Sequence, residues 1–232
     1  QASVLQSGFS SSQGLPALDA FGKTWGWRRG SGDWDGLMHK AARGEALSLE
    51  ADGGQPALSN WLLASGWPLA QTSSSSADLY LGSSTGAGCR WHPPVLWVGV
   101  GCERGSDLTL MSKAVDRALQ TAQLAPEAVA GLASITLKND ELALLALASE
   151  RNWPLKFFST DELNTQVVPN PSAVVKAEVG SPSVAEAAAL CAAGSGGELK
   201  LDKQISRGRP GEGAVTVAIA AAQQPWAPQR GH

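Results

Sequence analysis

The feature that most constrains the fold is a regular alternation of apolar strands and helices that begins near residue 95. An apolar, β-branched run over residues 94–101 indicates a buried strand. It is followed by residues 107–124, whose apolar side chains recur at the spacing of a helix with one buried face, which Ser106 or Asp107 can cap. The order then repeats, with a strand at 129–137, a helix at 139–152 that Asn139 or Asp140 can cap, and a strand at 154–158. This alternation predicts an α/β domain with a mostly parallel sheet.

The rest of this region adds short helices and two closing strands. Helices are expected over 159–162, 170–180 and 181–194, and strands over 198–204 and 214–220 around the loop 205–213. Ser159 with Glu162, and Ser183 with Glu186, fit capping boxes, which account for both glutamates. Asn170 suits the N-cap of the helix at 170–180. Because the last two strands have no helix between them, we predict a three-layer domain with a mixed, mostly parallel sheet.

Differences in composition along the chain predict four segments. Residues 1–70 hold five of the nine tryptophans and many glycines, so we expect a partial Gly/Trp-rich α/β segment there. Residues 71–94 have the Ser- and Gly-rich composition of a linker. The α/β domain spans 95–222, and 223–232 form a Pro-rich tail or fusion junction. The chain starts without methionine and ends in this tail, so we expect it to be a fragment of a longer protein.

The composition excludes several classes of function. A chain with 43% hydrophobic and 17% charged residues is typical of a soluble globular protein. Its formal net charge of -3, without a basic stripe, argues against nucleic-acid and membrane partners. Three cysteines and three histidines are scattered without a CxxC pair, so neither a disulfide framework nor a zinc site held by the protein is expected. This cysteine usage favours a cytoplasmic location.

The turn in VLWVGVGCERGSD, residues 95–107, is the first candidate site. In open α/β sheets, ligands bind beyond the carboxyl ends of the strands, near helix N-termini. Gly99, Gly101 and Gly105 allow the backbone to approach a ligand, and Arg104 can hold a carboxylate through two parallel hydrogen bonds. The glycine spacing is one residue longer than a dinucleotide-binding fingerprint. The alternative is a glycine-rich turn that only packs well.

Four further residues each have two interpretations. Cys102 is either a nucleophile with a lowered pKa at a helix N-terminus or a small buried hydrophobic residue. Lys138, Asp140 and Glu141 follow the second strand of the domain. They form either a general base with an anion anchor or a solvated helix start whose acids complement the helix dipole.

Six motifs carry a resemblance to a known family. The chain contains, in this order, VGVGCERG, ASITLKNDELALLALA, PLKFFSTDELN, VPNPSAVV, GSPSVAEAAAL and TVAIA. Their order and spacing resemble the carboxy-terminal domain shared by the cobalamin-biosynthesis proteins CbiG and CobE, over about residues 95–220. Residues 2–30 resemble the part of the CbiG amino-terminal domain that ends with a G-L-P-A-L-D run.

This resemblance implies a cobalt-precorrin-5A hydrolase, which opens the ring A δ-lactone of a cobalt corrinoid so that two carbons leave as acetaldehyde. Asp140 or Glu141 then activates water beside Lys138, and backbone N–H groups near residues 101–105 stabilise the oxyanion. The residues expected to bind the substrate are Gly101, Cys102, Arg104, Gly105, Asn164, Asn170 and Ser181. No cofactor held by the protein is implied, because the cobalt enters as part of the corrinoid.

Two other functions stay open. CobE consists essentially of this domain alone, which favours a non-catalytic module that binds a corrinoid intermediate. Such a module would hand the intermediate to a fused or neighbouring precorrin methyltransferase. A nucleotide-binding domain is the third hypothesis, and NAD or ATP would then raise the melting temperature. The sequence leaves open whether the protein forms a homodimer.

Overall fold

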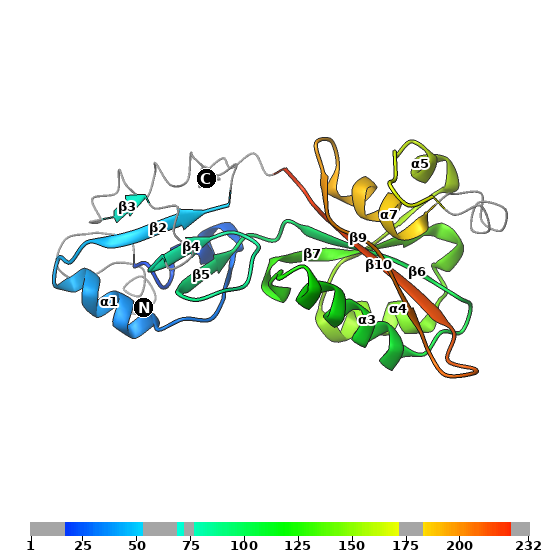
Figure 1. Cartoon of the computed structure of the whole chain (residues 1–232), viewed down its shortest axis with the longest axis horizontal. Coiled ribbons are helices and arrows are strands. Elements are labelled where there is room, and N and C mark those ends of the chain that lie inside the picture. Colours follow the sequence, from blue (N-terminus) through cyan, green and yellow to red (C-terminus); the bar gives the residue numbers. More distant parts are fainter. Residues whose placement is uncertain (1–16, 53–68, 72–76, 172–182, 224–232) are drawn as a thin grey trace, which may run out of the picture. The chain divides into compact units, whose positions relative to one another are not determined.

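The computed structural model describes residues 17–52, 69–71, 77–171 and 183–223. The chain divides into two units, and the second of them begins at Val95 (Figure 1). The described part of each unit contains one five-stranded sheet. Of the helices in these residues, none is both long and apolar enough to cross a membrane.

The second unit is a three-layer α/β fold whose sheet has the strand order β8-β7-β6-β10-β9. Its strands are β6 (Leu96–Cys102), β7 (Val129–Ile135), β8 (Leu155–Phe158), β9 (Glu198–Arg207) and β10 (Ala214–Ala221). β6, β7 and β8 run parallel, whereas β10 is antiparallel to both β6 and β9. The sheet is mixed and mostly parallel in strand direction, as expected, because β10 alone among these five strands runs opposite to the others.

Helices cover both faces of this sheet. They are α3 (Leu108–Thr121) and α4 (Leu142–Arg151) on one face, and α5 (Thr160–Asn164) and α7 (Val184–Ala193) on the other (Figure 1). Side chains of β6 alternate between the two cores, because Leu96 and Val98 pack with α3 and α4 while Trp97 packs with α7. A Cβ on Gly99 would lie 1.9 Å from the carbonyl oxygen of Ala185. Glycine is therefore required there, so that α7 can lie directly on the strand.

The predicted starts of α3 and α5 are confirmed. Asp107 caps α3, and its side chain accepts a hydrogen bond from the backbone N of Leu110 at 2.9 Å. At α5 the capping box of Ser159 and Glu162 is complete, with both reciprocal hydrogen bonds present. Local sequence patterns determine these two helix starts.

The predicted cap of α4 is wrong. Asn139 and Asp140 were the expected candidates, but Glu141 holds the N-cap position, without a side-chain hydrogen bond to the helix. The cause is a 3-10 turn over Thr136–Lys138, which follows β7 and delays the start of the helix. Glu141 is therefore buried at the base of α4 instead of lying on its first exposed turn.

The closing strands are longer than predicted. β9 extends to Arg207, so the loop before β10 covers residues 208–213 instead of 205–213. The helix predicted over 170–180 lies almost entirely outside the described residues.

The first unit contains a sheet in the order β1-β5-β4-β2-β3, in which only the pair β1–β5 is antiparallel. Its elements are a 3-10 turn (Phe21–Trp25), β1 (Arg28–Arg29), α1 (Trp34–Ala42), β2 (Leu47–Ala51), β3 (Leu69–Gln71), β4 (Leu79–Leu81) and β5 (Cys89–His92). The linker expected over 71–94 is wrong for residues 77–94. Both β4 and β5 lie inside the sheet, and Leu79, Leu81 and Trp91 are fully buried.

Candidate functional site

Most of the predicted site residues lie together at the carboxyl ends of β6 and β7. Because these strands are parallel neighbours, the turn after β6 and the 3-10 turn after β7 reach the same edge of the sheet. We call the group formed there the strand-end cluster. Its members are Cys102, Arg104, Gly105, Lys138, Asp140 and Glu141.

Arg104 is held by two partners on the other turn. Its Nη1 forms an ion pair with Asp140, and its Nη2 donates to the backbone oxygen of Leu137 at 3.0 Å. The hydrogen bond from Arg104 holds the pKa of Asp140 below its usual value. A carboxylate that is stabilised in its charged form is a weak base, so Asp140 is a poor candidate for activating water.

Glu141 has a buried carboxylate that is hydrogen-bonded through one oxygen. Its side chain is 4% exposed, and Oε1 accepts a hydrogen bond from the backbone N of Gly105 at 3.0 Å. Oε2 has no hydrogen-bond partner in the described part of the chain, although Lys138 Nζ lies 3.9 Å away and Arg104 Nη1 4.0 Å away. A buried carboxylate oxygen without a donor is costly unless water or a ligand supplies one. Oε2 is therefore the available proton acceptor of the cluster.

Packing explains Cys102 and Gly101. Burial raises the pKa of the Cys102 thiol to about 11, so at neutral pH it is not an activated nucleophile. A Cβ on Gly101 would lie 2.6 Å from Oγ1 of Thr216, so this glycine makes room for β10. Gly105 differs, because its φ of +73° requires a left-handed turn and open space lies beyond its Cα. Of the turn glycines, Gly105 is the one that faces the open edge.

Of the other three predicted site residues, two lie outside the strand-end cluster and one lies outside the described residues. Asn164 is the last residue of α5, and Ser181 lies outside the described residues. Asn170 binds Glu186, because its Nδ2 donates to Oε1 at 2.8 Å and its backbone N donates to Oε2 at 3.3 Å. Asn170 thus has a structural partner that the sequence did not indicate.

Glu186 does not form the capping box predicted with Ser183. Ser183 holds the N-cap position of α7, but no side-chain cap hydrogen bond is formed there. The carboxylate of Glu186 instead accepts hydrogen bonds from Asn170 and from the backbone N of Lys203, at 3.0 Å. Complete burial would raise the pKa of Glu186, but these hydrogen bonds hold it below its usual value. Unlike Glu141, Glu186 uses both oxygens within the fold.

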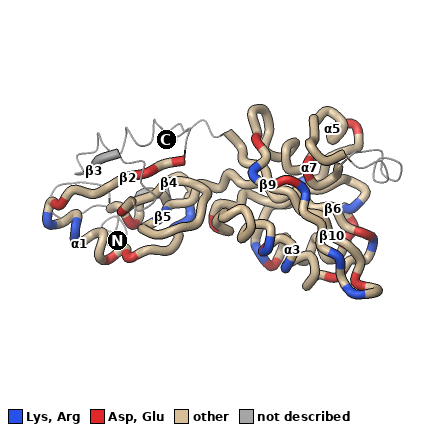
Figure 2. Tube along the Cα trace, viewed as in Figure 1, with Lys and Arg blue, Asp and Glu red and all other residues tan. Residues whose placement is uncertain are grey.

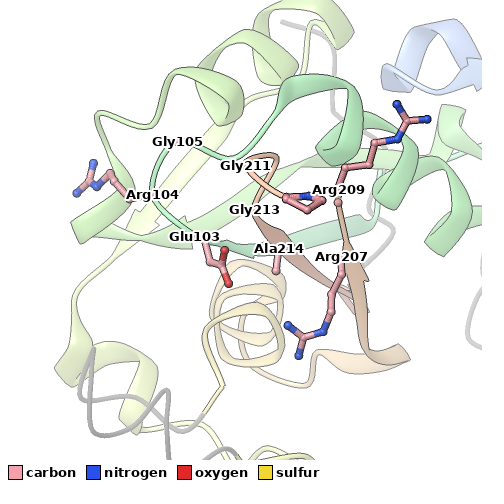
Figure 3. A pocket seen from close by; sticks show the side chains of 10 residues that line it. Glu103, Arg104, Gly105, Arg207, Arg209, Gly211, Gly213 and Ala214 are labelled. Atoms are coloured by element: carbon pink, nitrogen blue, oxygen red, sulfur yellow. The ribbon is translucent and has the colours of Figure 1, made fainter.

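A hollow that was not predicted from the sequence opens beside the cluster, between the turn after β6 and the β9–β10 hairpin (Figure 3). We call it the hairpin hollow. It measures about 550 Å³ and is lined by Glu103, Arg104, Gly105, Arg207, Gly208, Arg209, Pro210, Gly211, Gly213 and Ala214. Three arginines face one acid in this lining, and Figure 2 shows charged positions of both signs around the ends of β6 and β10. The run RGRPG, residues 207–211, is the sequence signal that indicates it.

Exposed apolar side chains accompany the charged groups of the cluster. Leu137 is 54% exposed and Leu142 is 80% exposed. Leu137 precedes Lys138 in the 3-10 turn, and Leu142 is the first residue of α4, directly after Glu141. Cations beside apolar surface suit a ligand that has an apolar body and anionic substituents.

Comparison with known proteins identifies the family. Residues 96–220 match the family described as Cobalamin synthesis G C-terminus. The chain is 33% identical over 133 residues to a cobalt-precorrin-5A hydrolase of Priestia megaterium, a match that covers 57% of this chain and 34% of that protein. It is 34% identical over 113 residues to protein CobE of a Sinorhizobium species, covering 48% of this chain and 73% of CobE.

A solved structure agrees with these matches. The crystal structure of CobE, a protein from the cobalamin (vitamin B12) biosynthetic pathway, is similar with a TM-score of 0.50 and 32% identity, over 56% of this chain and 91% of that one. The matched region thus spans about a third of the hydrolase but most of CobE. The α/β fold class and the resemblance to CbiG and CobE are confirmed. The chain belongs to the Cobalamin synthesis G C-terminus family and is a protein of cobalamin biosynthesis.

Proposed function

We propose that the strand-end cluster binds a carboxylated cobalt corrinoid and that, within the full-length protein, it hydrolyses the ring A δ-lactone of cobalt-precorrin-5A. The observation that carries the proposal is Oε2 of Glu141, a buried acceptor that has no donor among the described residues and lies 3.9 Å from Lys138 Nζ and 4.0 Å from Arg104 Nη1. The 33% identity with a cobalt-precorrin-5A hydrolase supports the choice of reaction.

Glu141 acts as the general base in this proposal. Its Oε1 stays fixed by the N–H of Gly105, while Oε2 takes a proton from water. The water oxygen bonds to the lactone carbonyl carbon, and the ring C–O bond then breaks. The alcohol oxygen takes the proton back from Glu141, and the new carboxylic acid loses its proton to solvent, so the products are a carboxylate and an alcohol. The two-carbon unit then leaves as acetaldehyde: the hydroxyl proton is released, the C–C bond to the macrocycle breaks, and its electron pair stays on the conjugated macrocycle.

Lys138 supplies the positive charge that the oxyanion needs. Of the backbone N–H groups that the sequence suggested for this role, those of Glu103 and Gly105 already donate to acceptors within the protein. The Lys138 side chain is mostly buried, and its Nζ lies beside Oε2 of Glu141. A cation held next to the base in a partly dry site stabilises the negative charge that develops on the carbonyl oxygen.

Arg104 and the exposed leucines suit the substrate. The corrinoid has an apolar ring with carboxylates at its periphery, and the cobalt belongs to this substrate. Arg104 can exchange the exposed carboxylate of Asp140 for one of these groups. Leu137 and Leu142 offer apolar surface to the ring.

The test is anaerobic incubation of the 232-residue chain with cobalt-precorrin-5A, following acetaldehyde and the corrinoid spectrum together. We expect Glu141→Gln to lower the rate of acetaldehyde release by at least about a hundredfold, the usual contribution of a general base. Glu150→Gln, the same change at an exposed position of α4, is the matched control. Equal rates for Glu141→Gln and the control would refute the role of Glu141.

A second candidate is a module that binds the corrinoid and passes it on without cleaving it. The coverage of the matches favours it, because the matched region spans 73% of CobE but only 34% of the hydrolase. In the same experiment, this function gives a spectral shift without acetaldehyde. It also predicts tight binding of the corrinoid, with release to a fused or neighbouring precorrin methyltransferase.

A further inference from the structure

The hairpin hollow contains two arginines that the proposed reaction does not use. Neither Arg207 nor Arg209 forms an ion pair with any residue that the structure describes. Both are exposed, and the one acid of the hairpin loop is already engaged, because Glu212 accepts a hydrogen bond from the backbone N of Arg209 at 2.8 Å. The two guanidinium groups therefore keep their positive charge available to a ligand.

The hairpin is fixed to the turn that carries Arg104. The backbone N of Asp107 donates to the oxygen of Glu212 at 3.0 Å, and the N of Glu103 donates to the oxygen of Ala214 at 2.9 Å. Within the loop, Gly208 N donates to the oxygen of Gly213 at 2.9 Å. A loop held by such hydrogen bonds loses little further conformational freedom when a ligand binds.

The arginines around the hollow point in different directions. Figure 3 shows Arg104 on one side of the hollow, Arg209 on the opposite side and Arg207 extending toward α7. A small anion such as phosphate contacts only one of such separated groups. A large ligand with carboxylates spread around its periphery can contact several. At Gly105 and Gly211, two glycines of the lining, an added Cβ would meet no atom within 4 Å, so the hollow is open to such a ligand there.

We infer that the hairpin hollow is a carboxylate-binding site for a macrocyclic polycarboxylate, in which Arg207 and Arg209 hold peripheral carboxylates and so select the substrate. This inference rests on the proposed function, since the same macrocycle would reach the strand-end cluster through Arg104, which belongs to both. Arg207 and Arg209 are then specificity-determining residues that leave the lactone chemistry to Glu141.

The experiment measures binding of two porphyrins to the 232-residue chain by fluorescence titration. Uroporphyrin carries two carboxylates on each pyrrole, and coproporphyrin carries one. We expect the double variant Arg207→Gln/Arg209→Gln to bind uroporphyrin about tenfold more weakly, with a smaller loss for coproporphyrin. Added salt should reduce the difference between wild type and variant, because exposed charges are screened.

Arg117→Gln is the matched control, because Arg117 is an exposed arginine on α3 that does not line the hollow. Circular dichroism checks that the variants fold. Equal affinity of the double variant and wild type for uroporphyrin, or no uroporphyrin binding by the wild type, would overturn the inference.

The outcome is separable from that of the proposed reaction. With cobalt-precorrin-5A, the double variant should raise KM about tenfold and leave kcat unchanged, because it removes binding contacts only. One outcome refutes the carboxylate-binding role of the hollow and keeps the proposed reaction. In it, Glu141→Gln loses acetaldehyde release while the double variant binds uroporphyrin as tightly as the wild type. Weakened uroporphyrin binding by the double variant, together with equal acetaldehyde rates for Glu141→Gln and its control, refutes the role of Glu141 in the reaction and keeps the inference about the hollow.

Discussion

In the first unit, Asp52 follows β2 and Ser83 follows β4, so two polar residues stand near the carboxyl ends of neighbouring parallel strands. Ser83 donates to Oδ2 of Asp52 from its backbone N at 2.7 Å and from its Oγ at 3.0 Å. The hydroxyl of Tyr80 donates to Oδ1, and the guanidinium of Arg90 lies 4.0 Å from the centre of the Tyr80 ring. Both oxygens of this carboxylate are used, and the network is closed.

The strand-end cluster occupies the corresponding edge of the other sheet and is built differently. Glu141 keeps one buried oxygen that receives no hydrogen bond from the residues that the structure describes, and the pair of Arg104 and Asp140 is exposed to solvent. Both edges lie at the carboxyl ends of parallel strands, so this position alone does not distinguish a structural network from a binding site. The hydrogen bonding of Glu141 distinguishes them, because buried polar groups in a purely structural network have their hydrogen bonds satisfied.

The largest loss of stability is expected for a substitution inside β6, before the strand reaches the strand-end cluster. A Cβ at position 99 collides with the backbone of α7 at Ala185, so Gly99→Ala should lower the free energy of unfolding by about 3 kcal/mol or more. Gly105→Ala meets open space and has only the backbone cost of a positive φ, about 1 kcal/mol. Urea unfolding followed by circular dichroism measures both. Equal losses of stability in the two variants would contradict the difference between the packed position 99 and the open position 105.

The next largest loss of stability is expected in the closed network around Asp52. Asp52→Ala leaves the Ser83 N–H and hydroxyl and the Tyr80 hydroxyl without their acceptor, so it should lower the free energy of unfolding by about 3 kcal/mol. Asp35→Ala, at an exposed position on α1, is the control and should have a small effect. The urea midpoint, followed by tryptophan fluorescence, gives the comparison. A loss no larger than that of the control would mean that the network does not stabilise the first unit.

Tyr80 allows the closed network to be followed by pH, because it is the single tyrosine of the chain. Burial and the hydrogen bond with Asp52 raise the pKa of Tyr80 to about 12. A pKa raised above the unfolded value gives a stability contribution that is complete below about pH 10 and is lost as the pH rises toward 12. Titration of the near-ultraviolet tyrosinate absorbance should therefore show a midpoint near pH 12, and Asp52→Asn should lower it. A wild-type midpoint near pH 10 contradicts the closed network.

Much of the second unit could be predicted from the sequence, because its elements are long and their signals are local. The apolar periodicity located β6 and α3, and the S-x-x-E pattern located the start of α5. Arg104 and Glu141 could be placed together because parallel neighbouring strands end at the same edge.

The features that the sequence did not reveal depend on contacts between distant residues. Ser183 and Glu186 fit the same S-x-x-E pattern, yet Glu186 is taken up by Asn170 and Lys203, which come from other parts of the chain. β4 and β5 are short and lie among serines and glycines, so only their burial in the sheet distinguishes them from a linker. The hairpin hollow likewise exists only because the β9–β10 loop is bound to the turn after β6.

The smallest effect is expected at the open edge, for Asp140→Asn. Water and salt screen the exposed pair of Arg104 and Asp140, so the urea midpoint at neutral pH should not change measurably. The hydrogen bond from Arg104 lowers the pKa of Asp140, so any stabilisation is present above the unfolded-state pKa and is lost as the pH falls through the lower folded-state value. Unfolding curves of wild type and variant should therefore coincide at acidic pH in every case. A clear loss at neutral pH would make this edge a closed network like that of Asp52, and Arg104 would then not be free to exchange Asp140 for a substrate carboxylate.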